Sequence, residues 1–294
     1  MGVINYNVVM NGIVIIDKPK GLTSRDVVNI VSKKFNTKKV GHTGTLDPLA
    51  TGVLVVAVNK ATKLVDLLTS SDKEYVAECV FGVSTDTLDS EGNVLSTEDA
   101  IISEYDIVNV LNSFKGTYNQ EVPAYSAVKI NGKKLYEYAR ENIEVKLPSR
   151  EVNIYDIKLI DKLIYQDNHT KITFRVNVSK GTYIRSLIRD IAKKLNTVGI
   201  MTNLRRIKQG KFNDYDAVKL DNLTTDNIIP IKDVLGIRCV ELTDEIIKKV
   251  VNGAKINNVY SDDKILFMKD NREIAIYKKD GNYMKIDKMI GGII

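Results

Sequence analysis

Four short apolar runs along the chain predict β-strands. Residues 12–16 (GIVII) form the first, which ends at a turn of sequence DKPKG. The run VLVVAV at 53–58 is apolar throughout, as in a strand that is buried on both faces. In the runs at 74–83 and 171–178, apolar and polar residues alternate, so each of these strands is expected to bury one face.

Apolar residues spaced three and four apart predict three helices. The first carries its apolar stripe over residues 27–35 and follows Thr23, a residue typical of a helix N-cap. The second covers about 101–114. The third, at 182–196, has the clearest amphipathic pattern in the chain, and Thr182 is its predicted N-cap.

Segments rich in glycine, proline and polar residues divide the remainder of the chain. Residues 40–52 (VGHTGTLDPLATG) hold three glycines, three threonines and a proline, which predicts a loop leading into the strand that follows. Residues 116–155 are polar and are predicted to form a long excursion from the core. Pro230 and Gly236 mark a boundary, and residues 236–294 form a small β-rich module with one helical pattern.

The distribution of charge favours a nucleic-acid partner. The chain carries a net charge of +6 with an isoelectric point near 9.0. Between residues 171 and 211, eleven lysines and arginines stand against one acid, Asp190, although a solvated face would have the same pattern. No run approaches the ~20 apolar residues of a membrane span, and the N-terminus lacks the features of a signal peptide. We therefore expect a cytoplasmic protein with no membrane contact.

Cysteine and histidine are too scarce for most metal sites. Cys79 and Cys239 lie far apart in apolar runs and are predicted to be two buried free thiols rather than a disulfide. The two histidines, His42 and His169, belong to no zinc motif. The chain also lacks the sequence signatures of nucleotide hydrolases, serine hydrolases and dinucleotide-binding enzymes. Any chemistry must therefore use carboxylates, hydroxyls and basic groups.

Asp47 and Arg185 are the strongest candidates for that chemistry. Asp47 stands in the predicted loop just before a buried strand, although an Asp-Pro pair also commonly shapes a turn. Arg185 falls in the first turn of the third helix, where the helix dipole disfavours a cation by about 0.3–1 kcal/mol. A buried arginine there implies a nearby carboxylate or phosphate, whereas an exposed one implies neither. Tyr75 and Tyr183 are either core residues or platforms on which a base could stack.

Five segments follow one another along the chain in a distinctive order. They are GHTGTLDPLATGVLVV (41–56), NKATKL (59–64), KEYVAECVFGVSTDTLD (73–89), PAYSAVKINGKKLYEYAR (123–140) and SKGTYIRSLIRDIAKKL (179–195). In content and order they resemble the TruB family of tRNA pseudouridine synthases. The resemblance covers roughly residues 10–235, and the chain beyond has a weaker likeness to an RNA-binding PUA-type module.

This resemblance implies a fold and an activity. The fold would be α+β, with a catalytic domain over residues 1–235 built on a mixed, mainly antiparallel sheet and a PUA-like module over 236–294. The activity would be isomerisation of uridine 55 in the TΨC loop of tRNA, with no cofactor and no metal. In this reaction the base is flipped out, the N1–C1′ bond breaks and the uracil is reattached through C5. Residues of about 124–152 resemble a thumb that closes on RNA, and the enzyme is expected to be a monomer without an obligatory protein partner.

The resemblance also implies roles for individual residues. Asp47 matches the catalytic aspartate, acting as nucleophile or as base; Tyr75 matches the tyrosine that stacks on the flipped base, and Arg185 the arginine that pairs with the aspartate. His42 matches a loop histidine that contacts the RNA, and Leu204 an apolar residue that lines the uracil pocket. Tyr183 and Lys63 are also expected to bind the substrate, and Arg205, Arg206 and Lys180 the RNA backbone. Arg205 and Arg206 are expected in an exposed turn after the basic helix, where phosphate contact is the natural use of their charge.

Three other functions stay open. A guide-RNA-dependent, dyskerin-type synthase shares the catalytic loop, but its sequence departs after LDP, whereas this chain continues as DPLATG. A non-catalytic RNA-binding or RNA-folding protein has no need for Asp47, Tyr75 and Arg185 together. A carboxylate glycosidase needs a second positioned acid, and the loop around Asp47 holds none.

Overall fold

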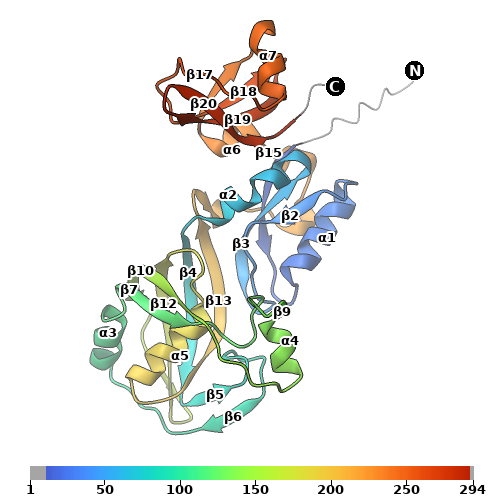
Figure 1. Cartoon of the computed structure of the whole chain (residues 1–294). Helices are drawn as coiled ribbons and strands as arrows, with labels where there is room; N and C mark the ends of the chain where they lie inside the picture. The colour runs from blue at the N-terminus through green and yellow to red at the C-terminus, as the bar shows by residue number, and fades with distance from the viewer. Residues whose placement is uncertain (1–10, 292–294) are drawn as a thin grey trace, which may run out of the picture.

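One large mixed sheet organises the computed structural model, which describes residues 11–291 (Figure 1). Its main path runs β15-β1-β3-β13-β4-β12-β10-β7, and every pairing along it is antiparallel except that of β13 with β3. The bounds are β15 Ile229–Pro230, β1 Gly12–Lys18, β3 Thr51–Val58, β13 Gly199–Gln209, β4 Lys73–Phe81, β12 His169–Val178, β10 Ser149–Leu159 and β7 Gly116–Glu121. Three short strands, β2 Val40–His42, β11 Ile164–Gln166 and β14 Phe212–Asn213, pair at its margins. The α+β class and the mainly antiparallel sheet are confirmed. The N-terminal segment 1–10, which the sequence predicts not to be a signal peptide, lies outside the described residues.

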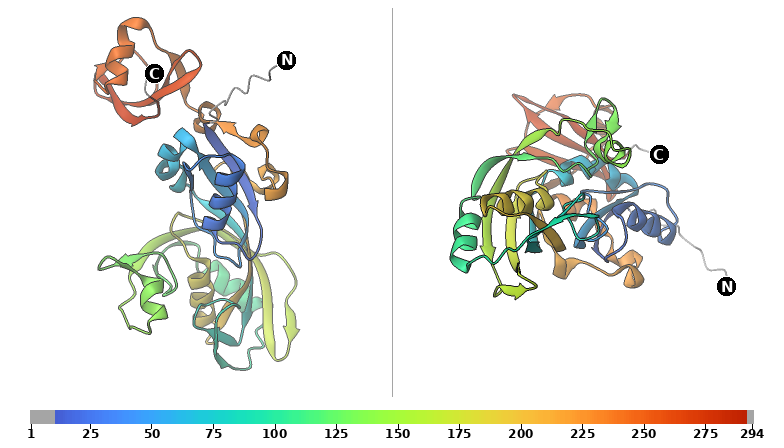
Figure 2. Two further views of the ribbon diagram at one scale, coloured as in Figure 1. Left: turned by 90° about the vertical axis from the view of Figure 1, so that its right-hand side faces the viewer. Right: turned by 90° about the horizontal axis from the view of Figure 1, so that it is seen from below.

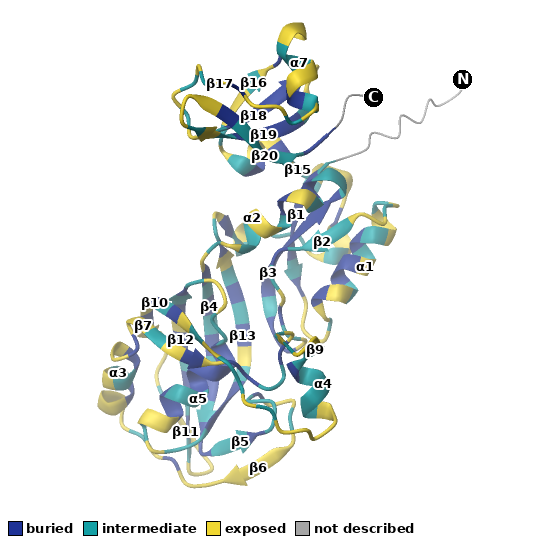
Figure 3. Ribbon diagram, viewed as in Figure 1, coloured by how far each residue is buried: buried dark blue, intermediate teal, exposed yellow. Residues whose placement is uncertain are grey.

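The two faces of this sheet bury two separate apolar clusters. Successive side chains of a strand point to opposite faces. In β1, Val14 and Ile16 enter the larger cluster, whereas Ile13 and Ile15 enter the second. Strand β3 divides in the same way, which explains why its residues 53–58 are all apolar. Figure 3 shows the central strands as the most buried part of the domain.

Helices α1 (Ser24–Lys34) and α5 (Ile184–Lys194) cover the face with the larger cluster. Thr23 caps α1 as predicted, by accepting a hydrogen bond from the backbone N–H of Asp26. The prediction of Thr182 as the N-cap of α5 is wrong, because Tyr183 holds that position and the Thr182 hydroxyl donates to the carbonyl of Ser179. The remaining helices in the first 235 residues are η1 Asn59–Leu64, α2 Val65–Thr69, α3 Glu104–Asn112, α4 Leu135–Arg140, η2 Asp214–Asp216, η3 Leu220–Asn222, η4 Thr225–Asn227 and α6 Ile231–Leu235.

The predicted excursion is shorter than the sequence suggested. Strands β7 and β10 pair from Ser149 opposite Glu121 to Ile154 opposite Gly116, so both limits of the 116–155 prediction fall within the sheet. They were missed because β7 is an edge strand whose side chains are largely polar and exposed. The segment that leaves the sheet is residues 122–148, called the excursion below, so a thumb over 124–152 would extend into β10. It carries the hairpin β8 (Lys129–Ile130)–β9 (Lys133–Lys134) and helix α4, and it projects from the sheet (Figure 2).

Two further strand regions were not predicted. Residues 199–209, which include the turn expected at Arg205 and Arg206, form β13 at the centre of the sheet. Its basic residues obscured its apolar alternation. The polar stretch after β4 contains a separate hairpin, β5 (Val83–Thr85) and β6 (Val94–Thr97), whose intervening turn contributes to the candidate site described below.

The C-terminal residues form a five-stranded sheet with its own core. Its strands are β16 Arg238–Glu241, β17 Ile256–Asn257, β18 Lys264–Lys269, β19 Arg272–Asp280 and β20 Tyr283–Met289, with helix α7 Asp244–Val251. Leu266, Met268, Ile276 and Ile290 also join the second cluster of the large sheet, so the C-terminal sheet docks on apolar surface. Cys79 is a buried free thiol as predicted, but Cys239 is exposed because β16 lies at the edge of this sheet.

Candidate active site

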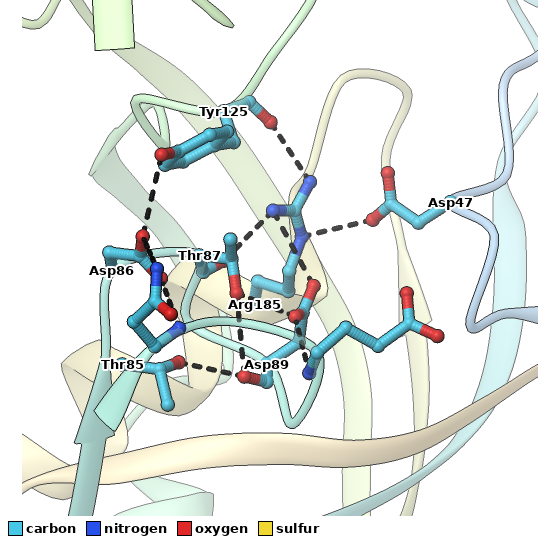
Figure 4. Close-up of polar contacts among 9 residues, drawn as sticks. Asp47, Thr85, Asp86, Thr87, Asp89, Tyr125 and Arg185 are labelled. Carbon is cyan, nitrogen blue, oxygen red and sulfur yellow. Dashed lines mark hydrogen bonds and ion pairs between the residues drawn. The ribbon is translucent and has the colours of Figure 1, made fainter. Parts of the chain in front are cut away.

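Asp47 and Arg185 form an ion pair between the loop before β3 and the first turn of α5 (Figure 4). Arg185 Nε lies 2.9 Å from Asp47 Oδ2. The arginine side chain is only 6% exposed, whereas the aspartate side chain is 35% exposed. The buried cation at a helix N-terminus therefore has a carboxylate partner, one of the two anions that the sequence allowed. Asp47 Oδ1 has no hydrogen-bond partner within residues 11–291, so one carboxylate oxygen is held and the other is available.

Three further groups that sequence reasoning missed surround the Arg185 guanidinium. Nη1 donates to the carbonyl of Thr87 at 2.9 Å and lies 3.8 Å from Asp89 Oδ2, while Nη2 donates to the carbonyl of Tyr125 at 3.1 Å. Two of these partners are backbone carbonyls, which residue types do not reveal. Asp89 was visible as the final acid of the KEYVAECVFGVSTDTLD segment, but nothing in the sequence pointed it toward Arg185.

The turn between β5 and β6 positions Asp89. Thr87 Oγ1 donates to Asp89 Oδ1 at 2.6 Å, and the backbone N–H of Glu91 donates to the same oxygen at 3.1 Å. Thr85 Oγ1 donates to the Asp89 carbonyl at 2.7 Å. Leu88 adopts a left-handed φ of 63° to complete the turn. A buried carboxylate with its own set of donors thus adds a second negative charge beside Arg185.

Buried polar side chains fix the loop that carries Asp47. Ser24 Oγ accepts from the Leu46 backbone N–H at 2.8 Å and donates to the Leu46 carbonyl at 3.1 Å. Gln209 Nε2 donates to the Thr43 carbonyl at 2.8 Å. Gly52 has a φ of 94°, and a Cβ atom there would lie 2.3 Å from a backbone oxygen of β13, so this position requires glycine.

The expectation of an exposed turn at Arg205 and Arg206 is wrong. Both residues lie in β13, and Arg206 is 1% exposed, with Nε donating to Val53 O at 2.7 Å and Nη2 donating to Gly44 O at 3.1 Å. Arg205 is partly exposed but pairs with Asp17 and Asp214. Arg206 therefore joins β13 to both ends of the loop that holds Asp47, and its donors are directed into the protein rather than toward phosphate.

Tyr75 and Leu204 lie on the neighbouring strands β4 and β13, and both are largely buried. Their side chains belong to the same buried cluster as Leu46 and Leu49 from the loop and Ile184 from α5. His42, the last residue of β2, lies near the start of the loop, and its Nδ1 accepts from the Gly44 N–H at 3.4 Å. Burial, with added repulsion from Arg25 and Arg206, lowers the pKa of His42. This histidine is therefore biased toward the neutral form.

The remaining predicted site residues lie at varying distances from the ion pair. Tyr183 directly precedes α5; its backbone N–H and C=O both bond to the Gln120 side chain, and Arg150 stacks on its ring with 5.3 Å between guanidinium carbon and ring centroid. Lys180 is exposed in the turn before α5. Lys63 is not brought to the site, because it lies beyond the far end of β3, where Nζ donates to the carbonyl of Ile290.

Besides Arg185, four of the eleven basic residues in 171–211 form ion pairs, most of them with acids from other segments. The ion pairs are Lys171–Glu78, Arg175–Glu74, Arg189–Glu121, Arg189–Asp190, Arg205–Asp17 and Arg205–Asp214. Within the described part of the chain, five exposed lysines of this stretch have no carboxylate at ion-pair distance: Lys180, Lys193, Lys194, Lys208 and Lys211. The local charge of this stretch is therefore much smaller in the folded protein than in the sequence.

Between residues 11 and 291, no group of three or more histidine, cysteine, aspartate or glutamate side chains is arranged to hold a metal ion. No helix in the same range is long and apolar enough to cross a membrane.

Family models match most of the region that builds this site. The model for the N-terminal domain of the TruB family of pseudouridylate synthases matches residues 32–184, and the C-terminal domain model of tRNA pseudouridylate synthase B matches residues 185–232. The chain belongs to the TruB family. The two matches meet between Ile184 and Arg185. Asp47 therefore lies in the part matched by the N-terminal model, and its partner Arg185 in the part matched by the C-terminal model.

Relatives across nearly the whole chain agree with this assignment. The chain is 41% identical to a protein of Caldicellulosiruptor saccharolyticus named tRNA pseudouridine synthase B, over 94% of this chain and 97% of the relative. It is 44% identical to a protein of that name from Clostridium kluyveri, over 85% and 86% of the two chains. Among solved structures, a Cbf5-Nop10-Gar1 complex contains a chain that matches 96% of this TruB-family protein at 26% identity, with a TM-score of 0.68 and 85% of that chain covered.

Proposed function

We propose that this protein isomerises uridine 55 in the TΨC loop of tRNA to pseudouridine, with Asp47 as the catalytic group. The observation that carries the proposal is a partly exposed carboxylate with one oxygen paired to a buried arginine, in a loop whose Leu46 and Leu49 share a buried cluster with Tyr75. Membership of a pseudouridylate synthase family supports the reaction class, and relatives named tRNA pseudouridine synthase B support tRNA as the substrate.

The reaction needs no co-reactant. The N1–C1′ bond breaks and a C5–C1′ bond forms, while C5 loses a proton and N1 gains one, so atoms and electrons balance. Asp47 Oδ1 is the oxygen available to act, either as a nucleophile or as a base toward the ribose. Arg185 orients the carboxylate through Oδ2, and Asp89 and Thr87 hold Arg185 in turn. The ion pair thus limits the orientations that the carboxylate can adopt before the substrate arrives.

The uridine must leave its stack before this carboxylate can reach it, at a cost of a few kcal/mol. In the proposed complex, Tyr75 stacks on the flipped uracil and recovers about 1–3 kcal/mol, a typical value for base–aromatic stacking. Leu204 belongs to the same buried cluster as Tyr75. His42 and Tyr183 contact the nucleotide from the two segments that carry Asp47 and Arg185.

RNA binding is proposed to use surfaces around this site. Lys180 contacts the phosphate backbone, since it is exposed near the start of α5. Arg205 contributes a secondary backbone contact, because two carboxylates already partly neutralise it. The excursion closes on the T arm as a thumb. We propose the domain boundary at residues 235/236, with the module 236–294 adding RNA contacts and the protein acting in the cytoplasm as a monomer with no obligatory protein partner.

A defined tRNA transcript tests this function. The purified protein alone is incubated with an unmodified transcript, and pseudouridine is located by its carbodiimide reactivity. We expect modification at position 55, and none in a matched transcript with cytidine at that position. An unmodified transcript after prolonged incubation, or modification only when a guide RNA and other proteins are added, would contradict the proposal.

A further inference from the structure

The guanidinium of Arg185 joins three segments that are far apart in the sequence. Its Nε binds Asp47 in the loop before β3, its Nη1 binds the turn between β5 and β6, and its Nη2 donates to the carbonyl of Tyr125 at 3.1 Å. A guanidinium is planar and rigid, so a displacement at one of these contacts alters the direction of the other N–H bonds. Tyr125 lies at the base of the excursion, whereas Asp47 and the β5–β6 turn belong to the body of the domain (Figure 4).

Tyr125 is connected to the β5–β6 hairpin by its side chain as well. Its hydroxyl donates to Asp86 Oδ2 at 3.4 Å, and Asp86 is fixed by the backbone N–H of Asn93, which donates to Oδ1 at 2.8 Å. At 3.4 Å the hydroxyl contact is longer than a typical O–H···O bond. It therefore has room to shorten if the base of the excursion moves toward the hairpin.

The packing at the base of the excursion allows such a movement. The next residue, Ser126, is 6% exposed, and its Oγ has no hydrogen-bond partner among the described residues. A buried hydroxyl without a partner costs about 1–3 kcal/mol, so this arrangement is not the best that the segment could adopt. Beside it lies a cavity of about 560 Å³, lined by Ala124, Leu135, Ala139 and residues 143–147. Leu135 and Ala139 belong to α4, so this helix borders the unfilled space.

We propose that Tyr125 is a positioning residue that couples closure of the excursion on RNA to the orientation of the Asp47–Arg185 pair. When the excursion closes, the Tyr125 hydroxyl approaches Asp86 and its carbonyl fixes Nη2 of Arg185. The Nε–H of Arg185 then aligns with Asp47 Oδ2, and the carboxylate reaches its reactive orientation only with RNA in place. This inference rests on the proposed function.

The test compares Tyr125→Phe with a matched control in the same segment. The control is Tyr138→Phe, because the Tyr138 hydroxyl donates to the Ile130 carbonyl at 3.2 Å inside the excursion and has no link to Arg185. We measure the single-turnover rate at saturating tRNA and the Kd for tRNA. Tyr125→Phe should lower the rate by about ten- to a hundredfold, the scale of a misoriented catalytic group, and should leave Kd within about twofold. Tyr138→Phe should leave both quantities within about twofold of wild type, since it is independent of the ion pair.

A second background separates positioning from general stability. If Tyr125 acts through Arg185, adding Tyr125→Phe to an Arg185→Lys variant should change the remaining rate by less than about twofold. If the Arg185→Lys rate is too low to measure, Asp89→Asn serves as the background instead. Tyr125→Phe should then lower the single-turnover rate by a smaller factor in Asp89→Asn than in the wild-type protein. Asp86→Asn, which removes the charge from the acceptor, should lower the rate in the same direction as Tyr125→Phe.

Two results would overturn the inference: a wild-type rate for Tyr125→Phe, or the same factor of loss in both backgrounds. If the wild-type protein forms no pseudouridine in tRNA, the proposed function fails instead, so the two failures are distinguishable.

Discussion

The ammonium of Lys18 donates to the carbonyl oxygen of Pro48, the residue after Asp47, at 3.3 Å from within the core. The same Nζ donates to the carbonyls of Pro19 and Leu22, so one side chain ties the turn after β1 to the loop before β3. Burial is the main reason that the pKa of Lys18 falls from 10.5 to about 8. A desolvated lysine therefore holds the backbone beside the proposed catalytic carboxylate.

This lowered pKa predicts how stability depends on pH. Between pH 8 and 10.5 the unfolded chain keeps Lys18 protonated while the folded protein releases the proton. Because the unfolded state then binds more protons, stability rises with pH across this window, and the penalty for burying the charge is greatest below pH 8. The free energy of unfolding of wild type minus that of Lys18→Met should therefore increase from below pH 8 to about pH 10. Urea unfolding of both proteins measures this difference, and a constant difference would show that Lys18 titrates at its ordinary pKa.

Arg206→Gln should reduce stability without changing the salt dependence of tRNA binding. The substitution removes donors to Val53 and Gly44 and leaves buried carbonyls unpaired, which should cost about 2–4 kcal/mol in the free energy of unfolding. Lys180→Gln is the matched comparison, because Lys180 is exposed. It should leave stability unchanged and flatten the slope of log affinity against log salt by about 0.7–0.9. A flattened slope for Arg206→Gln at wild-type stability would show that this arginine contacts phosphate after all.

Ending the chain at Leu235 should destabilise the catalytic domain. Leu266, Met268, Ile276 and Ile290 would be lost from the second apolar cluster, and the large sheet would expose apolar side chains to water. At about 1.5–3 kcal/mol for each buried side chain, the loss should exceed about 5 kcal/mol. Thermal unfolding and light scattering should show a lower Tm and association of the truncated chain. A monomeric truncation with the Tm of the full-length protein would contradict the view that the C-terminal sheet supports the fold.

Local patterns predicted the elements that carry the site. The strands at 12–16 and 53–58 were predicted because each is a short, continuous apolar run, and those at 74–83 and 171–178 because apolar and polar residues alternate. Helix α5 was predicted for the same reason. The pairing of Arg185 with a carboxylate was one of the outcomes foreseen from its position in the first turn of that helix.

Features that depend on distant partners could not be predicted in this way. Arg206 looked exposed because its acceptors are backbone carbonyls around 150 residues earlier in the chain. Tyr125 also binds Arg185 through its backbone carbonyl, and the type of a residue does not indicate where its carbonyl points. Asp89 reaches Arg185 only through a turn whose shape depends on a left-handed Leu88. Edge strand β7 is too polar to be distinguished from a loop by its sequence.

The central claim is that the carboxylate of Asp47 performs the reaction. The most direct test is the single-turnover rate of pseudouridine formation at position 55 by Asp47→Asn, with saturating tRNA. The amide is nearly isosteric but is neither nucleophile nor base, so we predict no detectable product while the Kd for tRNA stays within about threefold of wild type. Asp161→Asn, at an exposed bend, is the control and should retain the wild-type rate. Appreciable turnover by Asp47→Asn, with deamidation excluded by mass spectrometry, would contradict the assignment.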